Sequence, residues 1–460
     1  MAAAMAGFGV GTQAMFRSGK KTNIVYINID DMGWKDVAYM GSRFYETPNI
    51  DKLAAQGLVF TNAYAAAANC APSRACCMSG QYTPRHGIYT VGSSERGNPK
   101  TRKLVPVKNK TVLPDENVTV ADALKPGGYT SIMLGKWHLG KDPRSQGFDF
   151  NVGGNMSGHP ASYFSPYKNK DLPDGPKGEH LPYRLTDEAI SFLDQHGAAP
   201  FFMYLAFYSV HTPLQTTKKL DEKYTEKGGD TLQHNAKYAG MIESVDTNIG
   251  RLMDKLDELG LTDNTLVLFT SDNGGVWGIT SQSPLRAGKG SYYEGGIRVP
   301  MIARWPGVIE PGRTCDTPVI NIDFYPTFLD VAGVACPNGK LLDGVSLMPL
   351  LRGTGNLPQR PLFWHFPIYL EQYKYAANTR DPLFRTRPGS VIRFGDWKLH
   401  EYFEDGGLEL YNLKDDIGET TDLAKSMPGK VKELHQMLID WRTEVGAPIP
   451  TELNPKYKGN

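Results

Sequence analysis

Four short apolar segments of this chain each end in polar or charged side chains. The segments contain many β-branched and aromatic residues, which is typical of strands buried in a parallel sheet. Ligands bind at the carboxyl ends of strands in open α/β sheets, so we expect these polar ends to converge. The segments and their polar ends are 24–29 with Asp30 and Asp31, 129–135 with Lys136 and His138, 200–207 with His211, and 265–271 with Asp272 and Asn273.

Helical patterns lie between these strands, and the pattern changes near residue 353. Residues 185–195 and 233–259 show the spacing of amphipathic helices. The sequence therefore predicts an α/β domain over residues 21–352, with a large, mixed, mostly parallel sheet flanked by helices. Residues 353–460 contain short strands with tight turns and a final helix, which predicts a smaller antiparallel sheet plus helix. Residues 1–20 are expected to be a leader or disordered segment.

Composition excludes several classes of protein. A formal net charge of +1 over 460 residues argues against a general nucleic-acid binder, and no apolar run is long enough to span a membrane. Five cysteines do not make a disulfide framework, although Cys315 and Cys336 flank one segment and their pairing stays open. The small apolar residues near the N-terminus lack a basic n-region, so an export signal is expected to be incomplete or absent in this chain. We expect a periplasmic or secreted location.

The stretch from Cys70 to Gly80 combines a nucleophile-type residue with an anion-binding environment. Pro72 suits the first turn of a helix, and Gly80 suits its end. Cys70 would then lie at the positive end of the helix dipole, with Arg74 one turn inside. A tyrosine-phosphatase loop is excluded because only three residues separate Cys70 from Arg74. The spacing of Cys70, Cys76 and Cys77 does not fit a zinc site.

The polar strand ends also favour a metal site. Asp30, Asp31, Asp272 and Asn273 offer oxygen ligands, which suit Ca²⁺ or Mg²⁺ better than zinc. Such a site would place the cation beside Cys70 if the strands and the helix converge as expected.

Three motifs resemble those of the type I, formylglycine-dependent sulfatases. They are Cys-x-Pro-Ser-Arg from Cys70, Gly-Lys-Trp-His-Leu-Gly over 135–140, and the Gly-Lys-Gly…Glu-Gly-Gly segment over 288–296. The resemblance extends from about residue 23 to 423. It departs from the family pattern at Ser79, where Thr is more usual, and at Cys76 and Cys77, where larger apolar residues are usual. The resemblance implies the alkaline-phosphatase-like fold.

The resemblance also implies how the residues act. A maturation enzyme would convert Cys70 to Cα-formylglycine, whose hydrate attacks the sulfate ester and whose oxygen joins the metal ligands. Asp272 would deprotonate that hydrate, His211 would protonate the departing alcohol, and His138 would accept a proton as sulfate leaves. Charge on the transferring group would be neutralised by Arg74, Lys136 and Lys289.

The sequence favours a sulfated carbohydrate as substrate. The Gly- and Pro-rich insertion 142–183 carries His159, Tyr163, Phe164 and Tyr167, and a later segment carries Trp364 and His365; both look like sugar-facing walls. We expect His159, Trp364 and His365 to bind substrate. Small aryl sulfates, and phosphate or phosphonate monoesters hydrolysed on the same fold, are the alternative substrates. The non-enzyme alternative is a sulfated-glycan binding protein.

Overall fold

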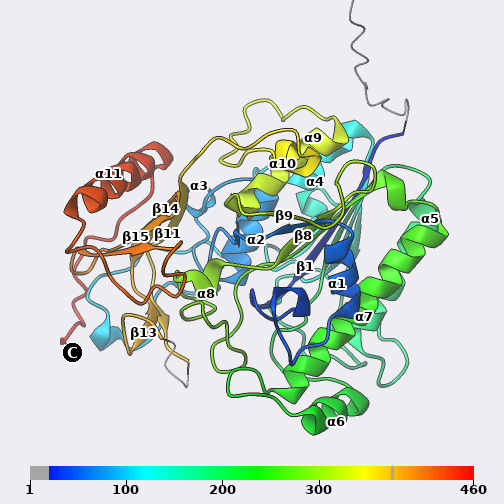
Figure 1. Cartoon of the computed structure of the whole chain (residues 1–460), viewed down its shortest axis with the longest axis horizontal. Helices are drawn as coiled ribbons and strands as arrows, with labels where there is room; N and C mark the ends of the chain where they lie inside the picture. The colour runs from blue at the N-terminus through cyan, green and yellow to red at the C-terminus, as the bar shows by residue number, and fades with distance from the viewer. Residues whose placement is uncertain (1–19, 374–377, 460) are drawn as a thin grey trace, which may run out of the picture.

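The computed structural model describes residues 20–373 and 378–459 (Figure 1). The strands of the large sheet are β1 (Asn23–Ile29), β2 (Leu58–Phe60), β4 (Thr130–Gly135), β5 (Phe150–Val152), β6 (Phe201–Ala206), β7 (Thr265–Ser271), β8 (Met301–Arg304) and β9 (Arg313–Cys315). The helices before residue 353 are α1 (Pro48–Ala55), α2 (Cys70–Ser79), α3 (Thr83–His86), α4 (Val120–Leu124), α5 (Leu181–His196), α6 (Lys218–Lys227), α7 (Ala236–Glu258), α8 (Glu294–Ile297), α9 (Phe324–Ala332) and α10 (Met348–Arg352).

The large sheet has the strand order β5-β4-β6-β1-β7-β8-β2-β9. The five strands from β5 to β7 are parallel, whereas β8 is antiparallel to both of its neighbours. The predicted mixed, mostly parallel sheet is therefore confirmed. Because β4, β6, β1 and β7 are consecutive and parallel, their carboxyl ends lie along one edge of the sheet. This agrees with the prediction that the polar residues after these strands converge.

Helices cover both faces of this sheet and make a three-layer structure. Ile24 and Tyr26 of β1 pack into one core with α2, α4 and α9. Val25, Ile27 and Ile29 alternate with them and pack into a second core with α1, α5 and α7. This alternation follows the pleat of a strand and explains why an apolar run without polar positions is stable here. Figure 1 shows α1 and α7 on one side of the sheet and α9 and α10 on the other.

A smaller sheet with the order β11-β14-β15-β16 follows the large one. Its strands are antiparallel and α11 packs against it, as predicted (Figure 1). Its core is continuous with side chains of the large domain, so the division at residue 352 stays a prediction. The remaining elements are β3 (Ala63–Tyr64), β10 (Val319–Ile320), β11 (Leu362–Phe366), β12 (Leu370–Glu371), β13 (Phe384–Thr386), β14 (Gly389–Phe394), β15 (Trp397–Tyr402), β16 (Gly407–Asn412) and α11 (Pro428–Val445).

Several short elements were not predicted. β5 forms an edge strand inside the insertion 142–183, and β9 pairs with β2 at the opposite edge. Both have three residues, too few for a periodic pattern to reveal them. Cys315 and Cys336 are both free, so the open question of their pairing is answered in the negative. Within the described residues, no helix combines the length and apolarity needed to cross a bilayer.

Candidate active site

The acidic residues meet at the ends of β1 and β7. Ile29 and Ser271 are partners in the sheet, so the residues that follow them lie side by side. The backbone N–H of Asp31 donates to Asp272 Oδ1 (3.2 Å), and Asn273 Nδ2 donates to Asp31 Oδ1 (2.8 Å). Asp31 takes a left-handed backbone conformation with φ of 65°, which changes the direction of the chain shortly after β1. The four side chains that follow the two strands, those of Asp30, Asp31, Asp272 and Asn273, are all buried.

Each buried aspartate has a cationic partner from a different part of the chain. Lys136 Nζ lies 2.5 Å from Asp30 Oδ2, and Lys289 Nζ lies 2.6 Å from Asp31 Oδ1. Arg74 contacts Asp272 Oδ2 through Nε and Nη2, both at 2.8 Å. The predicted residues therefore do come together. Buried charges need such pairing, since an isolated buried ion is strongly unfavourable.

Two oxygens of this cluster have no partner, and this identifies a place for a cation. Asp30 Oδ1 and Asn273 Oδ1 are both buried, and neither forms a hydrogen bond within residues 20–373 and 378–459. Burial raises the pKa of Asp30 well above its usual range, against the opposing pull of Lys136. Burial also acts to raise the pKa of Asp31, but Lys289, His211 and Lys136 outweigh it and hold that pKa well below its usual range. A divalent cation would satisfy the free oxygens and favour the ionised form of Asp30, so the residues fit a hard metal.

Cys70 lies at the start of α2 and close to this cluster. Its Sγ and single carboxylate oxygens of Asp30 and Asp272 all lie within 4.8 Å of one another. α2 begins at Cys70 and ends before Gly80, which has φ of 67°, so the predicted helix is confirmed. The Arg74 guanidinium also donates to the carbonyl oxygen of Lys136 (2.6 Å), which ties α2 to the end of β4. Residue 70 is thereby fixed over the acidic cluster.

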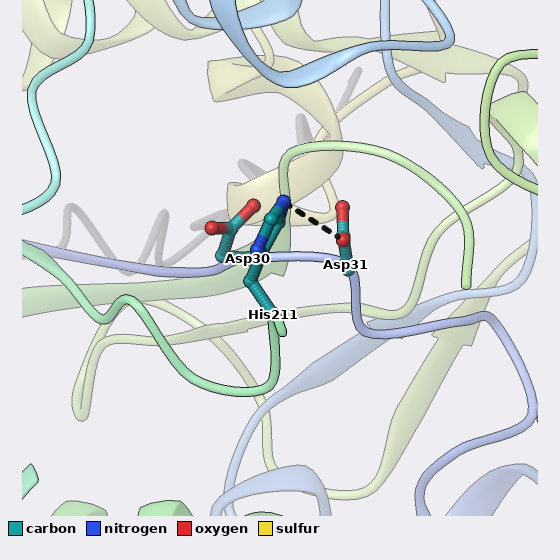
Figure 2. A group of neighbouring side chains, drawn as sticks. All are labelled: Asp30, Asp31 and His211. Atoms are coloured by element: carbon teal, nitrogen blue, oxygen red, sulfur yellow. Dashed lines mark ion pairs between the residues drawn. The ribbon is translucent and has the colours of Figure 1, made fainter. Parts of the chain in front are cut away.

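Two histidines complete the cluster. His211 Nε2 lies 3.6 Å from Asp31 Oδ2, and Figure 2 shows its ring beside both aspartates of β1. Its Nδ1 lies 2.7 Å from the carbonyl oxygen of Thr212, an acceptor, so Nδ1 carries the proton and Nε2 faces the cluster. Burial and then Lys289 lower the pKa of His211 to about 3, although Asp31 acts in the other direction. His138 Nδ1 is buried and has no hydrogen-bond partner in the part of the chain that the structure describes. Burial, followed by Lys136 and Arg74, lowers the pKa of this histidine.

The expected substrate-binding residues divide into two groups. His159 is exposed, and its ring lies parallel to that of His211 with centroids 6.2 Å apart. The prediction is wrong for Trp364 and His365, which are buried in the core of the small sheet. Trp364 Nε1 donates to the carbonyl oxygen of Ala65, and both ring nitrogens of His365 have partners within the protein. The aromatic composition of this segment alone did not distinguish a strand buried in the core from a segment that lines a binding site.

The aromatic residues of the insertion are also mostly buried. Of the three aromatic residues expected to face a sugar, Tyr163 and Tyr167 are buried and Phe164 is partly exposed. The Tyr163 hydroxyl lies within hydrogen-bonding distance of two carbonyl oxygens, those of Tyr208 (2.6 Å) and His211 (2.8 Å). Tyr163 therefore positions the backbone that carries His211 and does not face a substrate.

Sequence reasoning also missed how the Lys289 loop is held. Glu419, with φ of 51°, accepts from the backbone N–H of Glu294 (2.6 Å) and from Lys398 Nζ (2.9 Å), and its carbonyl oxygen accepts from Arg286 (2.9 Å). Burial would raise the pKa of Glu294, but Lys398 and two arginines outweigh it and hold that pKa at about 2. These contacts fix residues 286–298. Glu419 is more than a hundred residues away from this loop in sequence, so no local sequence pattern could predict the contact.

Comparison with known proteins identifies the family. Residues 22–334 match the sulfatase family, and residues 288–444 match the C-terminal region of N-sulphoglucosamine sulphohydrolase. The chain belongs to the sulfatase family. This sulfatase is 33% identical to a sulfatase of Formosa agariphila, over 94% of this chain and 90% of the relative. It is 32% identical to human N-acetylgalactosamine-6-sulfatase, over 75% of this chain and 68% of the relative.

Solved structures agree with this assignment. Ps i-CgsB in complex with k-i-k-neocarrahexaose superimposes with a TM-score of 0.77 and 29% identity, over 95% of both chains. The sulfatase thus has the alkaline-phosphatase-like fold, and family membership makes it a sulfuric ester hydrolase.

The buried network around Glu419 generates a prediction. Replacing this residue in Glu419→Gln removes one charge from a buried set, so we expect a loss of about 3 kcal/mol in the free energy of unfolding by urea. At a temperature where the variant is fully folded, we also expect reduced turnover of a sulfate ester, because Lys289 loses its support.

Glu433→Gln is the matched control. Glu433 pairs with Lys430 on the exposed side of α11, so its loss should change the free energy of unfolding by less than about 1 kcal/mol. Equal effects of the two substitutions would show that the Glu419 network does not stabilise the loop.

Proposed function

We propose that this sulfatase removes sulfate from a carbohydrate, with residue 70 matured to formylglycine and a Ca²⁺ or Mg²⁺ ion held by Asp30, Asp31, Asp272 and Asn273. The observation that carries the proposal is the placement of Cys70 Sγ beside the Asp30 and Asp272 carboxylates, at the mouth of α2. A maturation enzyme and an exported location belong to the same proposal.

The bound cation would polarise a sulfate oxygen, and a hydrated aldehyde at position 70 would supply the oxygen nucleophile that displaces the sugar alcohol from sulfur. Asp272 is placed to accept a proton from position 70, because its carboxylate is held there by Arg74. Among the described residues, the guanidinium of Arg74 contacts Asp272, Lys136 and Tyr204, so Arg74 acts by positioning Asp272.

Lys136 and Lys289 are suited to bind the transferring group. Each ammonium has three protons, and its pairing with one aspartate leaves donors for sulfate oxygens. In a site closed to water these fixed charges stabilise the developing negative charge more strongly than they would in solution.

The two histidines take the proton-transfer roles. His211 would protonate the departing alcohol oxygen, and His138 would accept a proton at position 70 as sulfate is released. Burial and then Lys289 lower the pKa of His211, which favours the neutral form of the ring before substrate binds. The negative charge of a bound sulfate ester would raise that pKa and favour the protonated form that the role requires.

The names of relatives support a carbohydrate substrate. Relatives include an N-acetylgalactosamine-6-sulfatase, and one similar structure contains a neocarrahexaose. An arylsulfatase of Hemicentrotus pulcherrimus, 30% identical, keeps small aryl sulfates as the alternative.

The nucleophile assignment is tested at residue 70. Cys70→Ala should lower kcat on any sulfate ester by about 10³-fold or more, because the variant cannot form an aldehyde. Its circular dichroism should match the wild type. The exposed Cys336 gives the control, and Cys336→Ala should keep full activity. Normal turnover by Cys70→Ala would refute the mechanism.

The general-acid role of His211 is tested by comparing substrates whose leaving groups differ in their need for protonation. His211→Asn should lower kcat on a sugar sulfate by about 10²- to 10⁴-fold, because a sugar alkoxide needs protonation to leave. On 4-nitrophenyl sulfate, whose phenolate leaves easily, we expect a much smaller loss.

His234→Asn is the control, since His234 is exposed and has no contact with the cluster. An equal loss on both substrates for His211→Asn would remove the general-acid role.

A further inference from the structure

Beside the acidic cluster, the insertion 142–183 forms most of a cavity of about 420 Å³. This volume is within the range of small-molecule sites. Several of its lining residues come from the segment 155–161, and Tyr208 also lines it. The Tyr208 hydroxyl donates to the carbonyl oxygen of Gly153 (3.0 Å), which ties the wall of the cavity to the segment after β6.

The cavity carries positive charge without acidic residues in its lining. Lys141, Lys168 and Lys170 line it, and no aspartate or glutamate does. Within the described part of the chain, Lys141 and Lys168 form no ion pair, and Lys170 Nζ lies 4.0 Å from Asp171. A recess lined by one sign of charge concentrates the field and attracts ligands of the opposite sign. Three lysines around one recess also repel one another, and a bound anion would relieve this repulsion.

The cavity adjoins the residues that act on the sulfate ester. His159 lines it, and the His159 ring is parallel to that of His211. The backbone N–H of His138 donates to the carbonyl oxygen of Asn155 (2.9 Å), and Asn155 also lines the cavity. Gly158 packs so closely on the His138 ring that a Cβ there would lie 2.5 Å from Cε1. The same short segment thus contacts both histidines and forms the cavity wall.

We propose that this cavity binds a second anionic group of the substrate, so that the enzyme acts on sugar chains with at least two negative charges. The inference rests on the proposed function, because it takes the acidic cluster as the place where the first sulfate reacts. The group in the cavity is a sulfate or a carboxylate on the same or the neighbouring sugar, recognised by Lys141, Lys168 and Lys170. Binding energy gained there would favour polyanionic glycans over aryl sulfates, which cannot reach the cavity.

The test measures binding separately from turnover. Full-length Cys70→Ala protein is titrated calorimetrically with N-acetylgalactosamine 6-sulfate, with its 4,6-disulfate, and with the disaccharide of the 6-sulfate and glucuronic acid. We expect tighter binding of a ligand with two anionic groups. The 4,6-disulfate and the uronic acid disaccharide distinguish sulfate from carboxylate as the second group.

The double substitution Lys141→Gln with Lys168→Gln should weaken the preferred ligand about tenfold, since each lysine contributes as a partly exposed ion pair. It should leave binding of the monosulfate unchanged. Lys177→Gln is the matched control, because Lys177 is an exposed lysine of the same insertion that does not line the cavity.

Turnover of 4-nitrophenyl sulfate by the enzyme with Cys70 intact separates the two proposals. If this ester is hydrolysed but the lysine substitutions leave all affinities unchanged, the second-anion site is wrong and the proposed function stands. If the ester and all sugar sulfates resist hydrolysis while lysine-dependent binding persists, the proposed function fails and the anion site stands. If Cys70→Ala protein with all three lysines intact binds ligands with one and two anionic groups equally tightly, the second-anion site is also wrong.

Discussion

The structure depends on the placement of three buried aspartates at two adjacent strand ends. Asp30, Asp31 and Asp272 would repel one another strongly in a site removed from water. Three basic side chains, from α2, from the end of β4 and from the loop before α8, offset this repulsion. The parallel order of β4, β6, β1 and β7 brings these distant segments together. Asp30 Oδ1 and Asn273 Oδ1, which have no hydrogen-bond partner among the described residues, are free to bind one more cation.

The C-terminal region that contains the small sheet also holds one of these basic side chains, Lys289, in place. Lys289 lies on a loop that the C-terminal region holds through Glu419, Lys398 and Arg385. The family match that begins at residue 288 and extends to 444 covers this loop and the small sheet together. We infer that the loop and the small sheet form one structural unit, which explains why the core of the small sheet is continuous with side chains of the large domain.

Much of the fold and the core of the site could be predicted because their signals are local. An apolar run followed by polar side chains identified each strand end, and the motif at Cys70 identified the helix that faces them. The roles of Trp364, His365 and Tyr163 could not be predicted, because an aromatic side chain has the same local sequence whether it fills a core or lines a pocket. The support that Glu419 gives to Lys289 depends on contacts between distant segments, which composition and periodicity do not record.

We infer that the carboxylates at the ends of β1 and β7 hold a hard divalent cation. Elemental analysis of the purified protein, after free metal has been removed, measures this cation. We expect about one Ca²⁺ or Mg²⁺ per chain, and we expect Asp31→Ala to lose both the cation and the activity. Stoichiometric zinc, with activity restored only by zinc, would show that the site does not hold a hard cation.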